Sequence, residues 1–362
     1  MTSPSDYLMT TSQDIIRTGQ AETGAYVASP NFSQYSYSWL RDGTWIAHGM
    51  AASGDTTSAD AFHRWAIRTL EQYAPRVEAA LEKRANRLPL DDSELLPTRF
   101  QLDGSLGVEA WGDFQLDGYG AWLWGFAQYC QNAQHPLWQT GRSVVKMLIG
   151  YLDAFWQAAN YDCWEEARDQ IHTATLAAIY GGVQAVQQID PVLVPEILPD
   201  VIRTFILTQC ISADGHFQKS IGNDAVDSSL LWCAVPFRVV ALTDPIFTTT
   251  LAKIERDLCS PTGGVYRYRM DTYFGGGEWV LLTAWLGWVY ADLERNVEAR
   301  AILRWVEAQT NNEGELPEQT HNHLLDPDYY SVWVEKWGAP AVPLLWSHGM
   351  YLILNARLKG RC

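Results

Sequence analysis

The chain has 362 residues, of which 47% are hydrophobic and 19% are charged, and it carries a formal net charge of −16. This composition is typical of a folded protein with a large core and excludes an intrinsically disordered chain. The excess of 42 acidic over 26 basic residues argues against nucleic acid or an anionic membrane as the partner. The sequence opens without a basic, apolar leader and its apolar runs are short, so we expect neither a signal peptide nor a membrane span.

Helical periodicity predicts about twelve helices and few strands. In chain order, the helices are expected near residues 6–18, 39–53, 57–82, 116–132, 137–157, 169–188, 190–209, 226–234, 246–258, 277–293, 296–310 and 340–358. The helix at 137–157 has one apolar stripe, whereas those at 116–132, 277–293 and 340–358 are apolar nearly all round and must be buried on every side. This alternation predicts an all-α fold, an (α/α)6 barrel with an outer and an inner ring, in one domain over residues 1–362.

Polar and aromatic clusters precede every second predicted helix. They lie at residues 35–42, 111–118, 162–169, 223–227, 267–279 and 315–319. In an alternating barrel these connections share one end, so we expect the clusters to converge on one acidic, aromatic cavity. Each of Asp42, Asp117 and Asp227 is also a plausible N-cap. The 17 tryptophans mostly indicate an aromatic core, and some are expected to wall a carbohydrate cleft.

The cysteines and histidines indicate no metal or cofactor. The six cysteines lie far apart, which predicts free thiols, no zinc knuckle and a cytoplasmic location. His321 and His323 alternate in a polar stretch without further ligands, and we expect them to be solvated. His348 follows Ser347 in an apolar stretch, which predicts a core histidine rather than a hydrolase triad, because no Gly-x-Ser-x-Gly motif accompanies it.

The ordered motifs resemble those of a known family. They are Tyr-x-Tyr-x-Trp-x-Arg-Asp from Tyr35, Gln-x-Asp-Gly from Gln115, Trp-Glu-Glu from Trp164, Arg-Tyr from Arg267 with a following Asp-Thr-Tyr, and Pro-Glu-Gln from Pro317 with a later Trp-Ser-His. Over roughly residues 13–357 the chain resembles glycoside hydrolase family 15, which contains glucoamylases, glucodextranases and related exo-acting α-glucosidases. The resemblance implies an (α/α)6 barrel that removes one glucose from a non-reducing end with inversion and gives β-glucose.

The resemblance also implies the roles of two glutamates. Glu165 corresponds to the general acid and Glu318 to the general base. An inverting hydrolase needs such a pair about 6.5–9.5 Å apart, with room for the attacking water. The acid must keep its proton near neutral pH, so we expect its pKa to be raised by burial or by a neighbouring carboxylate such as Glu166 or Asp162.

Substrate-binding residues are expected around this pair. By the resemblance, Arg41 and Asp42 hold the terminal glucose, Arg267 belongs to the Arg-Tyr motif, and Glu166 is a ligand near the next subsite. A guanidinium and a carboxylate are suited to sugar hydroxyls because one donates and the other accepts several hydrogen bonds. The full predicted binding set is Tyr35, Trp39, Arg41, Asp42, Trp111, Trp164, Glu166, Arg267 and Trp279.

Two further features bear on the substrate. Many bacterial members of the family carry an N-terminal β-sandwich and secreted fungal ones a starch-binding module, and this sequence contains neither. It is similar in kind to compact isomaltose glucohydrolases, so isomaltose or short isomaltooligosaccharides are the expected substrates, with maltooligosaccharides and trehalose as alternatives. We expect two segments, 84–110 and 319–340, to shape the aglycone subsite. The second would do so through Tyr329, Tyr330 and Trp333.

Two interpretations from other classes remain open at this point. A sugar epimerase or isomerase also uses a helical barrel with an acidic cleft, but such enzymes depend on histidine and only His172 lies near a motif. A catalytically silent carbohydrate-binding barrel is the second, and the presence of both carboxylates argues against it. The sequence does not indicate an oligomeric state.

Overall fold

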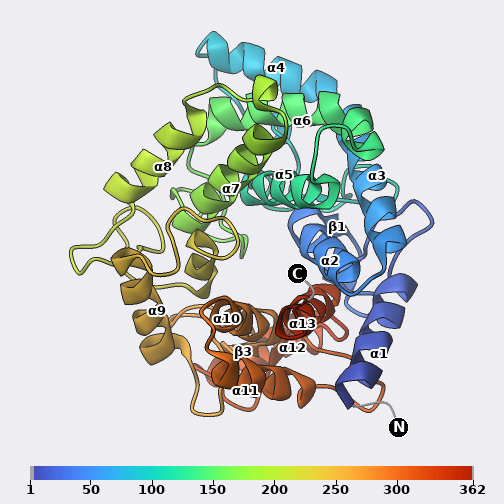
Figure 1. The fold of residues 1–362 in the computed structure, drawn as a ribbon, viewed down its shortest axis with the longest axis vertical. Helices are drawn as coiled ribbons and strands as arrows, with labels where there is room; N and C mark the ends of the chain where they lie inside the picture. The colour runs from blue at the N-terminus through green and yellow to red at the C-terminus, as the bar shows by residue number, and fades with distance from the viewer. Residues whose placement is uncertain (1–3, 361–362) are drawn as a thin grey trace.

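The computed structural model describes residues 4–360, and Figure 1 shows helices arranged as one ring inside another. The α-helices in these residues are α1 (Pro4–Thr18), α2 (Leu40–Ala52), α3 (Thr56–Gln72), α4 (Ala74–Ala85), α5 (Asp117–Cys130), α6 (Pro136–Phe155), α7 (Thr173–Ile189), α8 (Leu198–Gln209), α9 (Pro245–Leu258), α10 (Val280–Asp292), α11 (Asn296–Glu307), α12 (Asp328–Trp337) and α13 (Leu345–Leu358). Short 3₁₀ helices are η1 (Ser33–Tyr35), η2 (Asp92–Glu94), η3 (Pro191–Leu193), η4 (Ser228–Cys233) and η5 (Tyr273–Gly275).

The inner ring is closed and has six members. In order around the ring they are α2, α5, α7, η4, α10 and α13, and each contacts the next, with α13 returning to α2. The outer helices α1, α3, α6, α8, α9 and α11 each pack on an inner element. The predicted (α/α)6 barrel is therefore confirmed.

Burial explains which helices occupy which ring. Nearly every residue of α5, α10 and α13 is buried, as their all-round apolar sequences predict, whereas α6 buries only its apolar stripe. The centre of the inner ring is filled by an aromatic cluster, in which the Trp45 ring centroid lies 4.6 Å from that of Trp285 and 6.3 Å from that of Trp232. Because these side chains fill the middle, the barrel is a packed core with a floor rather than an open channel.

The first and last inner helices meet at two glycines. A Cβ atom added to Gly49 of α2 would lie 2.4 Å from the carbonyl oxygen of Gly349 on α13. Only the absence of a side chain allows the two backbones this close. The ring therefore closes by direct backbone packing between its two ends.

Two-residue strands fix the connections that lead into the inner ring. β1 (Ser38–Trp39) pairs antiparallel with β2 (Arg99–Phe100), and β3 (Glu278–Trp279) pairs antiparallel with β4 (Gln319–Thr320). β1 and β3 directly precede α2 and α10, so each pair anchors the start of an inner helix. Within residues 4–360, no helix is both long and apolar enough to cross a membrane.

Two predicted helices are wrong in kind. The segment 57–82 is two helices, α3 and α4, because Pro75 lacks an amide hydrogen and begins a new helix rather than continuing the first. The segment 226–234 is the 3₁₀ helix η4, which occupies the inner-ring position expected for an α-helix. Pro236 follows it and disfavours a longer helix for the same reason.

The remaining differences concern boundaries and one additional helix. The segment 190–209 forms η3 and then α8 from Leu198, and the segment 340–358 becomes helical only at Leu345. Residues 328–337 lie outside every predicted helix, but they form α12. This helix stands outside the two rings and packs against η5, so it is an addition to the barrel rather than a part of it.

Candidate active site

One cavity of about 530 Å³ opens where the connections into the inner ring meet. All eleven predicted catalytic and binding residues line it: Tyr35, Trp39, Arg41, Asp42, Trp111, Trp164, Glu165, Glu166, Arg267, Trp279 and Glu318. The other lining residues include Tyr161, Cys163, Tyr273, Trp333, Trp337 and Trp346. Five of the six predicted clusters therefore converge on the cavity as the alternation of helices predicts, whereas the cluster at 223–227 does not line it.

Aromatic rings form most of the wall. Seven of the 17 tryptophans line the cavity, and seven others are among the largest fully buried side chains of the core. The rings of Trp39 and Trp111 lie 6.2 Å apart on one side, and those of Trp164 and Trp279 lie 5.5 Å apart on another. Such rings present flat apolar faces, which suit the C–H faces of a sugar.

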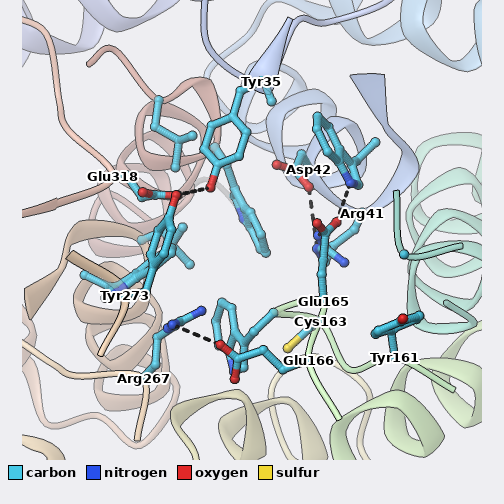
Figure 2. Close-up of a pocket in the computed structure, with 18 of the residues that line it drawn as sticks. Tyr35, Arg41, Asp42, Tyr161, Cys163, Glu165, Glu166, Arg267, Tyr273 and Glu318 are labelled. Carbon is cyan, nitrogen blue, oxygen red and sulfur yellow. Dashed lines mark hydrogen bonds and ion pairs between the residues drawn. The ribbon is translucent and has the colours of Figure 1, made fainter. Parts of the chain in front are cut away.

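Glu165 lies on the loop before α7 and points towards α2 (Figure 2). Its Oε1 accepts a hydrogen bond of 2.6 Å from the indole nitrogen of Trp39 and lies 3.6 Å from Nη2 of Arg41. Burial raises the pKa of Glu165, and the Arg41 charge and the Trp39 hydrogen bond act against this shift. The pKa is therefore raised as expected, and of the two causes named from the sequence burial is the one that favours the protonated acid.

Glu166 points in the opposite direction from Glu165, towards Arg267 (Figure 2). Its Oε1 accepts a hydrogen bond of 3.3 Å from Arg267, and its Oε2 accepts one from the Tyr268 hydroxyl. Arg267 in turn donates two hydrogen bonds to Asp271, the longer of them 2.7 Å. Glu166 is thus held by a cation and a phenol, whereas Glu165 faces Trp39 and Arg41.

Glu318 lies across the cavity from Glu165, beside Tyr35 and Tyr273 (Figure 2). Its Oε1 accepts a hydrogen bond of 2.9 Å from the Tyr35 hydroxyl, and the hydroxyls of Tyr35 and Tyr273 lie 2.9 Å apart. Its Oε2 is buried and has no hydrogen-bond partner among the described residues. Burial raises the pKa of Glu318 to about 7, and the Tyr35 hydrogen bond opposes this rise.

The start of α13 holds the loop that carries Glu318. Ser347 donates a hydrogen bond of 2.8 Å to the Pro317 carbonyl oxygen, and His348 Nε2 accepts one of 3.0 Å from the Leu316 amide. His348 Nδ1 lies 2.9 Å from the Ser12 hydroxyl, so the predicted core histidine is confirmed and both ring nitrogens have partners. The Trp-Ser-His motif therefore supports the position of the Glu318 loop.

Arg41 and Asp42 lie in the first turn of α2 and point into the site (Figure 2). Arg41 Nη1 donates a hydrogen bond of 2.8 Å to Gln115, and Arg41 Nε lies 3.5 Å from Asp42 Oδ2. Burial raises the pKa of Asp42 to about 7. Arg41 Nε and Asp42 Oδ2 are buried and make no hydrogen bond within residues 4–360. The two atoms form an ion pair with each other but no hydrogen bond, so a ligand could supply a donor to Asp42 and an acceptor to Arg41.

Several expectations about individual residues are corrected. The N-cap residues of α2 and α5 are Trp39 and Leu116, so Asp42 and Asp117 are not N-caps. Asp227 does cap η4 by accepting from the Ser229 amide, but its segment lies behind Trp164 instead of lining the cavity.

The segment 319–340 was expected to shape the aglycone subsite, and only part of it lines the cavity. Trp333 lines the wall as predicted, and Trp337 joins it. Tyr329 is exposed to solvent, and Tyr330 contacts Phe274, with ring centroids 6.4 Å apart. Neither tyrosine is among the lining residues, because the face of α12 that meets the cavity carries the two tryptophans instead.

Sequence reasoning missed three groups that organise the site. Tyr273 lies in a recognised motif but was not predicted to contact the candidate base. Arg99 was not singled out, yet its guanidinium lies between the rings of Tyr37 and Trp111, 3.9 and 3.8 Å from their centroids. Lys219 pairs with Asp162 and Asp227 behind the Glu165 loop. Arg99 and Lys219 lie in segments without a motif, so no local signal indicated them.

The histidines and cysteines of the described residues form no cluster suited to a metal ion. Among residues 4–360, no group of three or more His, Cys, Asp or Glu side chains is arranged to hold a metal ion. His321 and His323 are exposed. Five cysteines are free thiols, and all but Cys259 are buried. The cavity itself is lined by carboxylates, guanidinium groups, phenols and indoles, together with the thiol of Cys163.

Comparisons with known proteins agree with this arrangement. Residues 4–307 match the family described as glycosyl hydrolases family 15. An isomaltose glucohydrolase from Kribbella flavida is 41% identical over 360 residues, which cover 96% of this chain and 91% of that protein. A solved glycosidase variant in complex with glucose is 38% identical, with a TM-score of 0.92 over 98% of this chain and 97% of its own. A bacterial glucoamylase complexed with acarbose shares the fold at 20% identity and a TM-score of 0.77, covering 98% of this chain and 55% of its own.

Proposed function

Because the chain belongs to glycosyl hydrolases family 15 and is therefore a glycoside hydrolase, we propose that it is an exo-acting, inverting α-glucosidase. It releases β-glucose from the non-reducing end of small α-glucosides, with isomaltose and short α-1,6-linked isomaltooligosaccharides as its preferred substrates. The observation that carries this proposal is a floored cavity with Glu165 and Glu318 on opposite sides. The 41% identity to an isomaltose glucohydrolase supports the choice of linkage.

Glu165 acts as the general acid. Its Oε1 accepts from Trp39, which leaves Oε2 as the oxygen that carries the proton. The raised pKa keeps the carboxyl protonated in a larger fraction of molecules, as proton donation to the leaving oxygen requires. Glu166 is a substrate ligand instead, because its carboxylate points away from Glu165 and is engaged by Arg267 and the Tyr268 hydroxyl.

Glu318 acts as the general base. Tyr35 occupies Oε1, and Oε2 is free to accept a proton from the attacking water. The acid and the base then act on opposite faces of the sugar ring, and the bond at the anomeric carbon forms on the side away from the departing oxygen. This geometry inverts the configuration and yields β-glucose from an α-glucoside.

The terminal glucose is bound by residues of the inner ring. Arg41 donates to its hydroxyls, Asp42 accepts from them, and the aromatic walls cover its apolar faces. The aromatic cluster beneath the cavity gives it a closed end, so a chain end enters and an internal segment of a polymer does not. Trp333 and Trp337 of α12 add a wall at the aglycone side, which favours short substrates.

We further propose that residues 1–362 act as one catalytic domain in a reducing compartment. A single closed inner ring unites residues from α2 to α13, and the catalytic pair is drawn from both halves of the chain. The free thiols are consistent with such a compartment.

The proposal is tested by the anomer that is released first. Purified protein is incubated separately with isomaltose, maltose, trehalose and panose, and the anomeric protons of the glucose are followed by NMR. We expect β-glucose to appear first and isomaltose to be cleaved with the highest kcat/KM. Initial α-glucose, or no glucose from any of the four, would refute the inverting assignment.

The roles of the adjacent glutamates are tested by matched amide variants. Glu165→Gln is expected to lose about 100-fold or more in kcat, because the amide cannot donate a proton to the leaving oxygen. Glu166→Gln is expected to raise KM more than it lowers kcat. If Glu166→Gln is the inactive variant and Glu165→Gln turns over normally, the acid has been assigned to the wrong residue.

A further inference from the structure

The loop that carries Glu165 adopts an unfavourable backbone conformation. Glu165 has a φ of +68° and Ala167 a φ of +48°, and neither is glycine. Residues with a side chain seldom adopt this left-handed conformation, and it persists only where surrounding contacts impose it. Something outside the loop must therefore hold Glu165 in place.

Asp162 provides the contacts within the loop. Its carbonyl oxygen accepts a hydrogen bond of 2.9 Å from the Glu165 amide, and its amide donates one of 3.0 Å to the Glu166 carbonyl. Its carboxylate Oδ1 accepts from the amides of Trp164 at 3.0 Å and Glu166 at 2.8 Å. Asp162 thus ties together the backbone on both sides of Glu165, and it does so from a buried position.

A second buried aspartate holds the indole beside Glu165. Both carboxylate oxygens of Asp227 accept from the Trp164 indole nitrogen, at 3.1 and 3.0 Å. Two buried carboxylates close to the same loop repel each other and lose hydration, so the arrangement needs a compensating cation.

Lys219 supplies that cation. Its Nζ lies 3.0 Å from Asp227 Oδ2, 3.9 Å from Asp162 Oδ2, and 3.3 Å from the centroid of the Tyr268 ring. Its side chain is only 12% exposed. Its carbonyl oxygen accepts from the Thr173 amide at the start of α7, which fixes the lysine backbone to the inner ring.

We propose that Lys219 is the positioning residue of the general acid: its ammonium group joins Asp162 and Asp227 and so holds the strained Glu165 loop against α7. Lys219 does not line the cavity, so it acts through the loop and not on the sugar. The Tyr268 ring that covers the ammonium group also bonds Glu166, which links the lysine to both glutamates. This inference rests on the proposed role of Glu165 as the acid.

The expected consequence is a selective loss of acid catalysis. Without the ammonium group, the loop relaxes and Glu165 leaves its alignment with the leaving oxygen, while Arg41 and Asp42 of α2 still hold the glucose. A substrate with a good leaving group, such as p-nitrophenyl α-glucoside, needs little protonation and is affected less. A loss confined to general structure would lower the rates on both substrates together.

The test compares Lys219→Met and Lys219→Arg with wild type on isomaltose and on p-nitrophenyl α-glucoside. We expect Lys219→Met to lose about tenfold or more in kcat on isomaltose, with KM changed little and a clearly smaller loss on the aryl glucoside. Lys219→Arg restores most of the rate because it retains the charge. Lys253→Met, which removes a lysine paired with Asp257 on the outer helix α9, serves as the control and behaves as wild type.

Equal losses on the two substrates, or an unchanged rate with isomaltose, would overturn the inference. If Lys219→Met does not fold, as judged by thermal melting, Asp227→Asn is compared on the same two substrates, and an equal loss on both has the same meaning. Wild type that cleaves neither substrate refutes the proposed function instead, so the two failures are distinguishable.

Discussion

Replacing Tyr35 with phenylalanine probes the environment of the catalytic base with little disturbance of packing. The substitution removes the hydroxyl that donates to Glu318 Oε1 at 2.9 Å. It keeps the ring, whose centroid lies 4.7 Å from that of Phe32 and 5.9 Å from that of Trp39. The change therefore removes the hydrogen bond to the Glu318 carboxylate, together with the contact between the Tyr35 and Tyr273 hydroxyls.

The magnitude follows from the strength of that bond. A hydrogen bond to a charged group contributes about 1.5–3 kcal/mol. Since about 1.4 kcal/mol is a factor of ten, kcat/KM should fall about 10- to 100-fold at acidic pH. The bond lowers the pKa of Glu318, which burial has raised to about 7. Its loss raises that pKa further, so a smaller fraction of the base is ionised below neutral pH.

The assay is the ratio of variant to wild-type kcat/KM on isomaltose, measured between about pH 5 and pH 8. We expect the ratio to be lowest at acidic pH and to rise as the pH passes through the raised pKa. Tyr37→Phe is the matched control, because the Tyr37 hydroxyl bonds the exposed Glu109 and not a candidate catalytic residue. A ratio for Tyr35→Phe that stays near one, or is independent of pH, would refute the reasoning.

Two further predictions concern stability. Burial raises the pKa of Glu318 from 4.5 to about 7, so its stabilising effect is complete below about pH 4.5 and is lost as the pH rises through 7. Glu318→Gln should therefore abolish activity. At about pH 8 its free energy of unfolding should exceed that of wild type by up to about 3 kcal/mol, which a higher melting temperature would show, and at about pH 4 there should be no gain. Gly49→Ala should destabilise by about 1–3 kcal/mol, because its Cβ would lie 2.4 Å from the Gly349 oxygen. Gly150→Ala on α6 meets no atom within 4 Å, so denaturant unfolding should show no loss, and equal behaviour of the two alanine variants would contradict the packing argument.

The two rings were predictable because the burial of a helix is reflected in how many of its faces carry apolar residues. Helices such as α10 that are apolar on every face can lie only inside, and the alternation with amphipathic helices orders the chain. The segment 226–234 contains a shorter apolar run from Leu230, and such a run does not distinguish a six-residue 3₁₀ turn from an α-helix. Pro75 and Pro236 indicate where these helices cannot continue, since each proline lacks a backbone hydrogen-bond donor.

α12 was missed although its sequence contained a signal. Tyr330, Trp333, Val334 and Trp337 fall at i, i+3, i+4 and i+7, which is the stripe of an amphipathic helix. The helix packs on η5 outside the ring, so the rule of alternating helices gave it no place.

The residues of the site were predictable from the sequence, but the hydrogen bonds and ion pairs among them were not. Motifs and the parity of the helices brought Glu165, Glu318 and Arg41 to one cavity without any knowledge of distances. The direction of adjacent side chains depends on the backbone torsions of the loop, and the φ of +68° at Glu165 has no signature in the residue itself. Lys219 joins the site only through three-dimensional contacts, so its part could be found only in the structure.

The closure of the inner ring makes turnover a reporter of complete folding. α13 packs against α2, and Ser347 and His348 at its start fix the loop of Glu318. A refolding chain that has formed every helix but has not yet docked α13 on α2 would show nearly its full circular dichroism signal and no hydrolysis. The delay between the recovery of the circular dichroism signal and the recovery of hydrolysis would therefore measure how long α13 takes to dock on α2.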